Sequence, residues 1–314
     1  MTPDTISGEP AMSESARNGR AYALLTFTAM CWAANAVFGQ LAIGEVSPMV
    51  LVALRWFGVT VLLMVFAQRH IRRDWALMRP QLGYLFAMGA LGFAAFNAVF
   101  YVAAHSTTAV NMGIIQGAMP VIVIVGAFLA YRTRVTHMQI GGMLITIAGV
   151  AVLASGGDPA RLAALEVNRG DLLMLAAAVM YGTYTVGLRR CPPVSPLALL
   201  AVLAGAAFAT SIPMVAAEAM LGQLQGPTPK GWAIAAAVTI FPSMLAQIFF
   251  IRGVALIGPG RAGVFINLVP VFASVLAVTF LGEAFEAHHA IALALVLCGI
   301  GLSERGKVKS RQLS

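Results

Sequence analysis

Long apolar runs that recur along the chain restrict this sequence to one structural class. The hydrocarbon core of a bilayer is about 30 Å thick and an α-helix rises about 1.5 Å per residue, so a spanning helix needs about 20 residues. Runs of this length cover residues 21–42, 48–67, 83–103, 107–131, 138–155, 171–189, 196–217, 232–251, 262–281 and 288–303. They predict an all-α integral membrane protein with ten transmembrane helices, and their length favours helices over an outer-membrane barrel of short alternating strands.

The composition agrees with a chain that lies mostly in lipid. Hydrophobic residues make up 60% of the 314 residues and charged residues 10%, whereas about a quarter are charged in an ordinary soluble domain. The gaps between runs are short and hold charges or turn residues, as in 69–75, 156–162 and 222–230. No soluble domain is therefore expected between the spans.

The net charge of +8 sets the predicted orientation. If the N-terminus is cytoplasmic, 16 of the 20 Lys and Arg residues fall on the inside, three (Arg161, Arg169 and Lys230) on the outside, and Arg55 within a span. This asymmetry follows the positive-inside rule and predicts that both termini are cytoplasmic. The basic charge thus reflects membrane orientation and not a nucleic-acid partner.

Motifs for cofactors, metals and catalysis lack the context that they require. The stretch GPGRAG at 258–263 matches a dinucleotide-binding pattern, but it follows one apolar span and opens another instead of joining a strand to a soluble helix. Cys31, Cys191 and Cys298 have no paired spacing, and Glu283, Glu286, His288 and His289 are expected in a solvated turn. We predict no cofactor, no metal site and no catalytic residues.

The chain contains an internal repeat at a shift of 150 residues. The shift places Gly113 on Gly263, Pro120 on Pro270 and Asn97 beside Gln247. Each repeat holds five spans, and because five is odd the second must enter the membrane from the opposite side, which gives inverted repeats of the kind found in secondary transporters. The predicted divisions are a disordered cytoplasmic tail (1–20), a first repeat (21–155), an external linker (156–170), a second repeat (171–304) and a basic cytoplasmic tail (305–314).

The sequence resembles the EamA-type transporters of the drug/metabolite transporter superfamily. The resemblance rests on the ten spans in two repeats, on Trp32 and Arg55, and on the blocks STTAVNMGIIQGAMPVIVIVGAFLAYRTRV and GPGRAGVFINLVPVFASVLAVTFLGEAF. Within the family the chain is most similar to bacterial inner-membrane exporters of aromatic amino acids, which implies a small-molecule substrate. One departure is that the first repeat reads YRTR at 131–134 where the second reads LGEA at 281–284.

Polar and aromatic residues inside the spans are the candidate contacts for that substrate, because buried polar groups are costly in a membrane. The predicted substrate-binding residues are Trp32, Asn35, Arg55, Asn97, Tyr101, Gln116, Tyr181, Tyr184, Gln247 and Asn267. Arg55 suits a carboxylate, although snorkelling or bonding to backbone carbonyls remains an alternative. The amides suit a neutral or zwitterionic solute, with interhelical packing as their alternative role.

These features predict a carrier that exports small metabolites, with aromatic and other neutral amino acids as the first expectation, by alternating access. Exporters of other amino acids or cationic drugs are the alternatives, ahead of a channel or an intramembrane enzyme. No Asp or Glu lies deep within a span, so no obligatory proton coupling is expected. Pro120 and Pro270 are predicted to be hinges that are related by the inverted repeat and serve opposite mouths of the cavity, and a static kink that shapes the cavity is the alternative. The oligomeric state stays open and is compatible with a monomer.

Overall fold

The described part of the chain comprises residues 14–158, 160 and 168–312, and within these ranges the computed structural model is built from helices without strands. Ten of its helical stretches are long and apolar enough to cross a membrane, as the sequence predicts. The chain is therefore an all-α, multi-pass membrane protein. Several spans are composed of more than one helical segment.

The first five spans follow one another with short connections. The first two are α1 (Glu14–Leu41) and α2 (Pro48–Phe66). Helix α3 (Gln68–Met78) and a 3₁₀ turn (Arg79–Gln81) then lead into the third span, which is made of α4 (Leu82–Gly89), a π-helical segment η2 (Ala90–Ala95) and α5 (Phe96–Ala104). The fourth span is made of α6 (Ala109–Gln116) and α7 (Met119–Tyr131), and the fifth is α8 (His137–Ala154).

The second five spans repeat this plan. The sixth span is α10 (Arg169–Gly187) with a 3₁₀ turn (Leu188–Arg190), and the seventh is α11 (Pro196–Met220). The eighth span is made of α12 (Pro229–Val238), a π-helical segment η4 (Thr239–Leu245) and α13 (Ala246–Ile257). The ninth is made of α14 (Pro259–Val264), a 3₁₀ segment η5 (Phe265–Leu268), α15 (Val269–Leu276) and a π-helical segment η6 (Ala277–Leu281), and the tenth is α16 (Ala287–Gln312).

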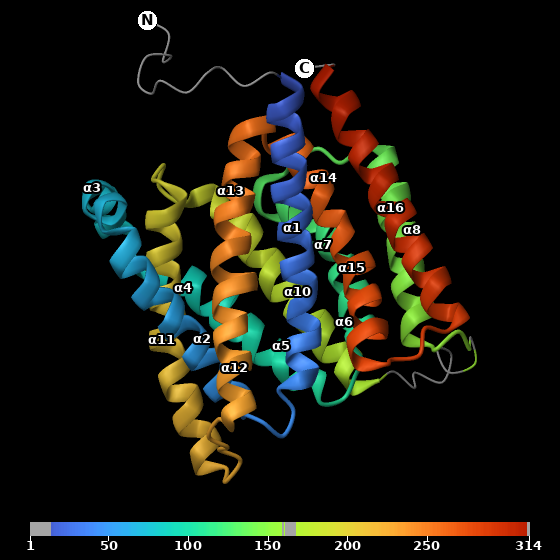
Figure 1. The fold of residues 1–314 in the computed structure, drawn as a ribbon. Helices are drawn as coiled ribbons and strands as arrows, with labels where there is room; N and C mark the ends of the chain where they lie inside the picture. The colour runs from blue at the N-terminus through green and yellow to red at the C-terminus, as the bar shows by residue number, and fades with distance from the viewer. Residues whose placement is uncertain (1–13, 159, 161–167, 313–314) are drawn as a thin grey trace, which may run out of the picture.

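The spans form a single bundle whose described ends lie together (Figure 1). We call the end that holds the start of α1, the end of α16 and α3 the terminal end, and the opposite end the distal end. Helices α8 and α16 run side by side at one edge of the bundle. In the predicted orientation the terminal end faces the cytoplasm.

Two helical boundaries differ from those expected from the sequence. Helix α1 already begins at Glu14, so residues 14–20 of the predicted tail are helical, whereas residues 1–13 lie outside the described part. Residues 69–75, expected as a loop, belong to the amphipathic helix α3, which Figure 1 shows end-on beside the upright spans. Its arginines and exposed Trp75 are typical of a helix at a membrane interface.

The two repeats agree in their irregularities as well as in their span count. The third and eighth spans each contain a π-helical segment at matching positions, η2 and η4. The fourth and ninth spans are each interrupted just before the repeated proline. Arg132 and Gly282, which are 150 residues apart, both end a helix in the left-handed conformation, with φ of 53° and 67°. Such irregularities recur because both halves have the same fold.

The apolar runs predict that Pro120 and Pro270 lie inside continuous helices, but in the structure each proline lies near the start of a helix. Helix α6 ends at Gln116, and Pro120 is the second residue of α7 after a short turn. Pro270 is likewise the second residue of α15, directly after the 3₁₀ segment η5. Proline suits the first turn of a helix because its missing N–H has no partner to lose there. Each proline thus starts a new helical segment after a break.

The left-handed residue Arg132 gives a stability prediction. It is the one non-glycine residue with positive φ in the described ranges, and this conformation costs an L-residue roughly 1 kcal/mol that glycine avoids. Arg132→Gly is therefore expected to raise the free energy of unfolding by about 1 kcal/mol, measured by titrating the purified protein from mild detergent into sodium dodecyl sulfate. Arg134→Gly, which removes the same charge from the same loop, should not stabilise the protein. Equal effects of the two variants would contradict this explanation.

The repeat-related glycines give a second prediction, because only one of them is packed tightly. A Cβ on Gly113 would lie 2.3 Å from the Cβ of Ala273, where α6 meets α15, whereas a Cβ on Gly263 would meet nothing within 4 Å. Gly113→Ala is expected to lower the free energy of unfolding by about 1–3 kcal/mol through overpacking. Gly263→Ala is the matched control and should be tolerated. Tolerance of both variants would mean that the α6–α15 contact is looser than described.

Candidate substrate-binding site

Arg55 is the only basic residue that the sequence places clearly within a span, and it is buried. It lies on α2, seven residues after Pro48, which corresponds to about 10 Å from the distal end of that helix. Its exposed fraction is 5%, so the side chain does not snorkel to water. A charge in this position must be solvated by protein groups.

Four polar side chains solvate the Arg55 guanidinium. Nη1 donates to Asn35 Oδ1 at 2.8 Å, to Asn97 Oδ1 at 2.8 Å and to Tyr101 Oη at 2.7 Å, and Nε donates to Ser243 Oγ at 2.7 Å. Tyr101 Oη in turn donates to Asn35 Oδ1 at 3.1 Å. We call these five residues, which come from α1, α2, α5 and η4, the Arg55 cluster. It joins both repeats, because Ser243 belongs to the second.

The π-helical segments position two members of this cluster. Asn97 is the second residue of α5, just after η2, and donates through Nδ2 to Phe93 O within η2 at 2.7 Å. Ser243 lies within η4 and donates to Val238 O, five residues earlier, at 2.6 Å. Each side chain therefore gives its hydrogen to its own widened helix and turns an oxygen toward Arg55. Such π-helical segments are frequent at functional sites.

The positive charge of the cluster has no balancing negative charge. All four acceptors are neutral oxygens, and no carboxylate lies within 4.0 Å of the guanidinium in the described ranges. Among the described residues, the Arg55 Nη2 atom makes no hydrogen bond, and the Nε1 atom of the adjacent Trp56 is buried without an acceptor. The site is therefore rich in donors and lacks an anion, which is costly unless a ligand supplies one.

Aromatic rings line one side of the cluster. The Trp56 ring lies 5.3 Å from Arg55 Cζ and stacks on Phe93 at 4.5 Å between centroids. Tyr184 continues this row at 5.3 Å from Phe93, and Tyr181 lies 5.4 Å from Tyr184. The predicted pair on the sixth span is thus connected to the cluster through Phe93 of the third span and Trp56 of the second.

The other predicted residues make no hydrogen bond to the cluster. Trp32 is half-buried and contacts the Phe250 ring at 5.4 Å. Gln116 donates to Met112 O of its own helix at 3.4 Å. Gln247 and Asn267 are half-buried, and neither takes part in a side-chain hydrogen bond to the described residues. The repeat pairs Asn97 with Gln247, but the eighth span contributes Ser243 to the cluster instead.

The sequence reading missed Ser243, Trp56 and Phe93. A serine inside a span is inconspicuous, because it normally bonds to its own helix. For Ser243 the available signal was the neighbouring Pro242, because a proline marks an irregular helix, and this span is the repeat partner of the span that holds Asn97. For Trp56 the signal was its position next to Arg55. None of these indicates a contact without the fold.

Carboxylates connect the repeats at the distal end. Glu283 accepts from the backbone N–H groups of Ala109 and Val110 at 2.8 and 2.9 Å and so caps α6; the solvated turn expected for it is wrong. Glu218 accepts from Ser47 Oγ at 2.6 Å. A hydrogen bond from Thr228 lowers the pKa of the Glu45 carboxyl, with a further contribution from Lys230, whose Nζ lies 3.2 Å from Oε1.

Ten spans in two inverted repeats with a buried polar cluster between them are an architecture typical of membrane transporters. A sequence profile of the EamA-like transporter family matches residues 19–155 and 168–304, which are the two repeats. The chain therefore belongs to the EamA-like transporter family. It is a membrane transporter of this type.

Relatives and a solved structure agree with this assignment. The uncharacterized transporter YetK of Bacillus subtilis (strain 168) is 23% identical over 281 residues, which cover 89% of this chain and 85% of that protein. An uncharacterized transporter of Archaeoglobus fulgidus is 23% identical over 292 residues, covering 91% and 98%. One crystal structure superposes with a TM-score of 0.61 at 21% identity, over 93% of this chain and 98% of that one, which shows the shared fold.

Proposed function

We propose that the protein exports small carboxylate-bearing zwitterions, and in the first place aromatic and other neutral amino acids, by alternating access across a bacterial inner membrane. The observation that carries this proposal is the buried Arg55 guanidinium, which has four neutral acceptors and no carboxylate within 4.0 Å among the described residues. A substrate carboxylate supplies the missing negative charge. An arginine also binds a carboxylate with better geometry than a lysine does.

The aromatic row supports the choice among amino acids. Rings at centroid distances of 4.5–5.4 Å, formed by Trp56, Phe93, Tyr184 and Tyr181, continue from Arg55. A planar or aliphatic side chain can pack on such surfaces while its carboxylate is held by the guanidinium. A doubly charged sugar phosphate would need more buried cations than Arg55 provides, and a cationic drug would be repelled by it.

The transport direction rests on the predicted orientation. The excess of Lys and Arg at the terminal end supports a cytoplasmic location of both termini. The substrate then binds from the terminal end and leaves at the distal end. A monomer is sufficient for this cycle, since the Arg55 cluster is formed within one chain.

Uptake into proteoliposomes by the purified protein tests the proposed function. Vesicles are offered labelled phenylalanine, tyrosine, leucine and alanine, with sugar phosphates and quaternary ammonium drugs as competitors. We expect saturable amino-acid uptake that is accelerated by unlabelled amino acid inside the vesicles, which a channel would not show. If only a non-amino-acid solute moved, the substrate assignment would fail while the transporter family remained.

The same vesicles test whether a proton gradient drives transport. No carboxylate within 4.0 Å of Arg55 in the described ranges could exchange a proton at the cluster. We therefore expect uptake rates to be the same, within about twofold, with and without a pH difference across the membrane. Uptake that requires the gradient would overturn this prediction.

A further inference from the structure

Glu283 ties the start of the fourth span to the second repeat at the distal end. Its carboxylate lies in the connection between η6 and α16 and accepts from Ala109 N and Val110 N, at 2.8 and 2.9 Å, in the first turn of α6. A carboxylate at a helix start also interacts favourably with the helix dipole. This contact between the repeats is therefore stronger than a hydrogen bond between neutral groups.

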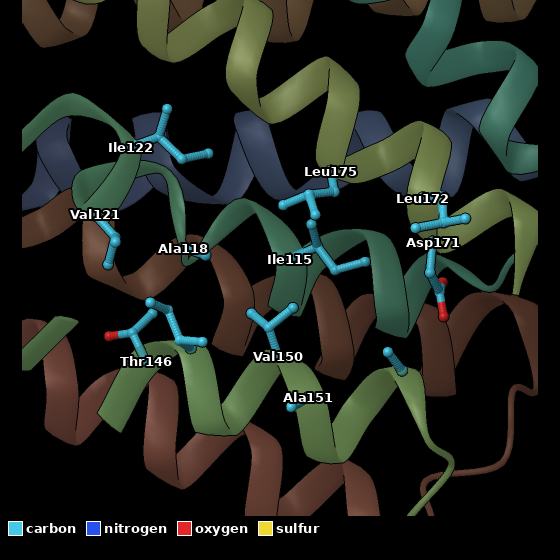
Figure 2. Close-up of a pocket in the computed structure, with 12 residues that line it drawn as sticks. Ile115, Ala118, Val121, Ile122, Thr146, Val150, Ala151, Asp171, Leu172 and Leu175 are labelled. Atoms are coloured by element: carbon cyan, nitrogen blue, oxygen red, sulfur yellow. The ribbon is translucent and has the colours of Figure 1, made fainter. Parts of the chain in front are cut away.

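A second carboxylate of the second repeat holds the same helix start. Asp171, in the first turn of α10, accepts from Thr107 Oγ1 and from Asn111 Nδ2, the latter at 3.2 Å from each carboxylate oxygen. Figure 2 shows its side chain extending from α10 toward the start of the fourth span. The start of α6 is thus fixed by acidic groups from two elements of the second repeat.

The terminal end lacks the repeat-related counterpart of the Glu283 contact. The shift of 150 residues places Thr133 where Glu283 lies, and Pro259 where Ala109 lies. Threonine has no carboxylate and proline has no N–H, so the acceptor and one of its two donors are both missing. Helix α14 accordingly begins without a side-chain hydrogen bond from its N-cap residue.

Weaker contacts hold the terminal end of the fourth span. Tyr131 donates to Val186 O at 3.1 Å, and the Arg189 Cζ atom lies 4.7 Å from the centroid of the Tyr131 ring. The hydrogen bond joins neutral groups, and Arg189 is exposed, where a cation–π contact contributes least. The contacts at the two ends of this span are therefore unequal, and the stronger ones lie at the distal end.

The contacts between α2 and α11 show the balanced case. Ser47 Oγ donates to Glu218 at 2.6 Å at the distal end, and Ser195 N donates to Asp74 at 2.7 Å at the terminal end. Each carboxylate comes from one repeat and meets the helix start of the other. This pair favours neither end, whereas Glu283 acts at one end alone.

We infer that Glu283 is a latch that holds the distal mouth of the transporter closed and must release α6 before the solute leaves there. Helix α6 is the distal half of the fourth span and lies between Glu283 and the break before Pro120, so bending at this break moves its start away from the carboxylate. Because the terminal end has no matching carboxylate, the protein without substrate rests closed at the distal end. The inference rests on the proposed alternating-access cycle and is independent of which solute is carried.

Distances between paired spin labels test the latch in the absence of substrate. The distal pair is His105→Cys with Ala284→Cys. The terminal pair, its counterpart in the repeat, is Ala255→Cys with Arg134→Cys; all four positions are exposed, and the native cysteines are replaced. In nanodiscs we expect the short distal distance to be the main population. Glu283→Gln should raise the ratio of long to short distal distances by about tenfold, because a neutral amide oxygen binds the N–H groups more weakly.

Glu286→Gln is the matched control, since it removes an exposed carboxylate from the same connection, and it should leave the ratio unchanged. The double variant Thr133→Glu with Pro259→Ala supplies the missing acceptor and donor at the terminal end. It should shift the terminal pair toward its short distance, a gain that loss of folding cannot produce.

Two results would overturn the inference. One is a distal ratio in Glu283→Gln that stays within about twofold of the ratio in Glu286→Gln. The other is an unchanged terminal distance in the double variant, which also decides the matter if Glu283→Gln does not fold. The predicted distance changes without any amino-acid uptake would remove the proposed substrate and keep the latch.

Discussion

Replacing Arg55 with methionine is expected to abolish amino-acid transport without unfolding the protein. Methionine has comparable length and removes an uncompensated buried charge, and such replacements are often neutral for stability. Some stability is lost because the oxygens of Asn35 and Asn97 no longer receive hydrogen bonds from the guanidinium. The substrate carboxylate, however, has no cationic partner left. Initial rates of labelled phenylalanine uptake into proteoliposomes measure the effect.

Arg55→Lys separates charge from geometry. Lysine keeps the positive charge but lacks the planar guanidinium. In Arg55 that group contacts Asn97 through Nη1 and Ser243 through Nε, while its Nη2 makes no hydrogen bond to the described residues. We expect uptake to fall by about a hundredfold, and thermal stabilisation by phenylalanine to disappear while the melting temperature of the free protein changes little. A variant that melts much earlier but still transports would show that Arg55 serves only to hold the helices together.

Replacing the repeated prolines is expected to slow exchange more than it weakens binding. Alanine at Pro120 restores a backbone N–H in the first turn of α7, so the turn between α6 and α7 can rewind into a continuous helix. Pro270→Ala acts equally on the break before α15. We expect substrate exchange to slow by about tenfold in each variant, with the dissociation constant changed by less than about threefold.

The control for this prediction is another proline in a span. Pro213 lies inside the continuous helix α11, and Pro213→Ala should leave exchange nearly unchanged. Exchange is measured by counterflow, and binding by the thermal shift that phenylalanine causes. If binding weakens as much as exchange slows, the prolines shape the site and are not hinges.

The membrane environment explains why the fold could be predicted from the sequence. A chain in lipid must satisfy its backbone within each span, so apolar length determines the helices directly. The cost of burying polar groups also predicts Asn35, Arg55 and Asn97 as site residues, and Tyr101 is predicted as an aromatic residue beside Asn97; the structure brings all four into one cluster.

The remaining features depend on how the helices are interrupted. The π-helical segment η4 turns Ser243 toward Arg55, and neither hydropathy nor symmetry indicates this rotation. Symmetry in fact favoured Gln247, because matching positions in the repeats have the same backbone but different neighbours. The amphipathic helix α3 was mistaken for a loop, since its charges broke the apolar run.

Competition during counterflow tests most directly whether Arg55 recognises a carboxylate. Vesicles loaded with unlabelled phenylalanine take up labelled phenylalanine in the presence of excess leucine, phenethylamine or phenylalaninamide. We predict that leucine, which keeps the carboxylate, suppresses the signal, and that both compounds lacking a carboxylate leave it unchanged. Suppression by phenethylamine to the same degree as by leucine would contradict the central claim.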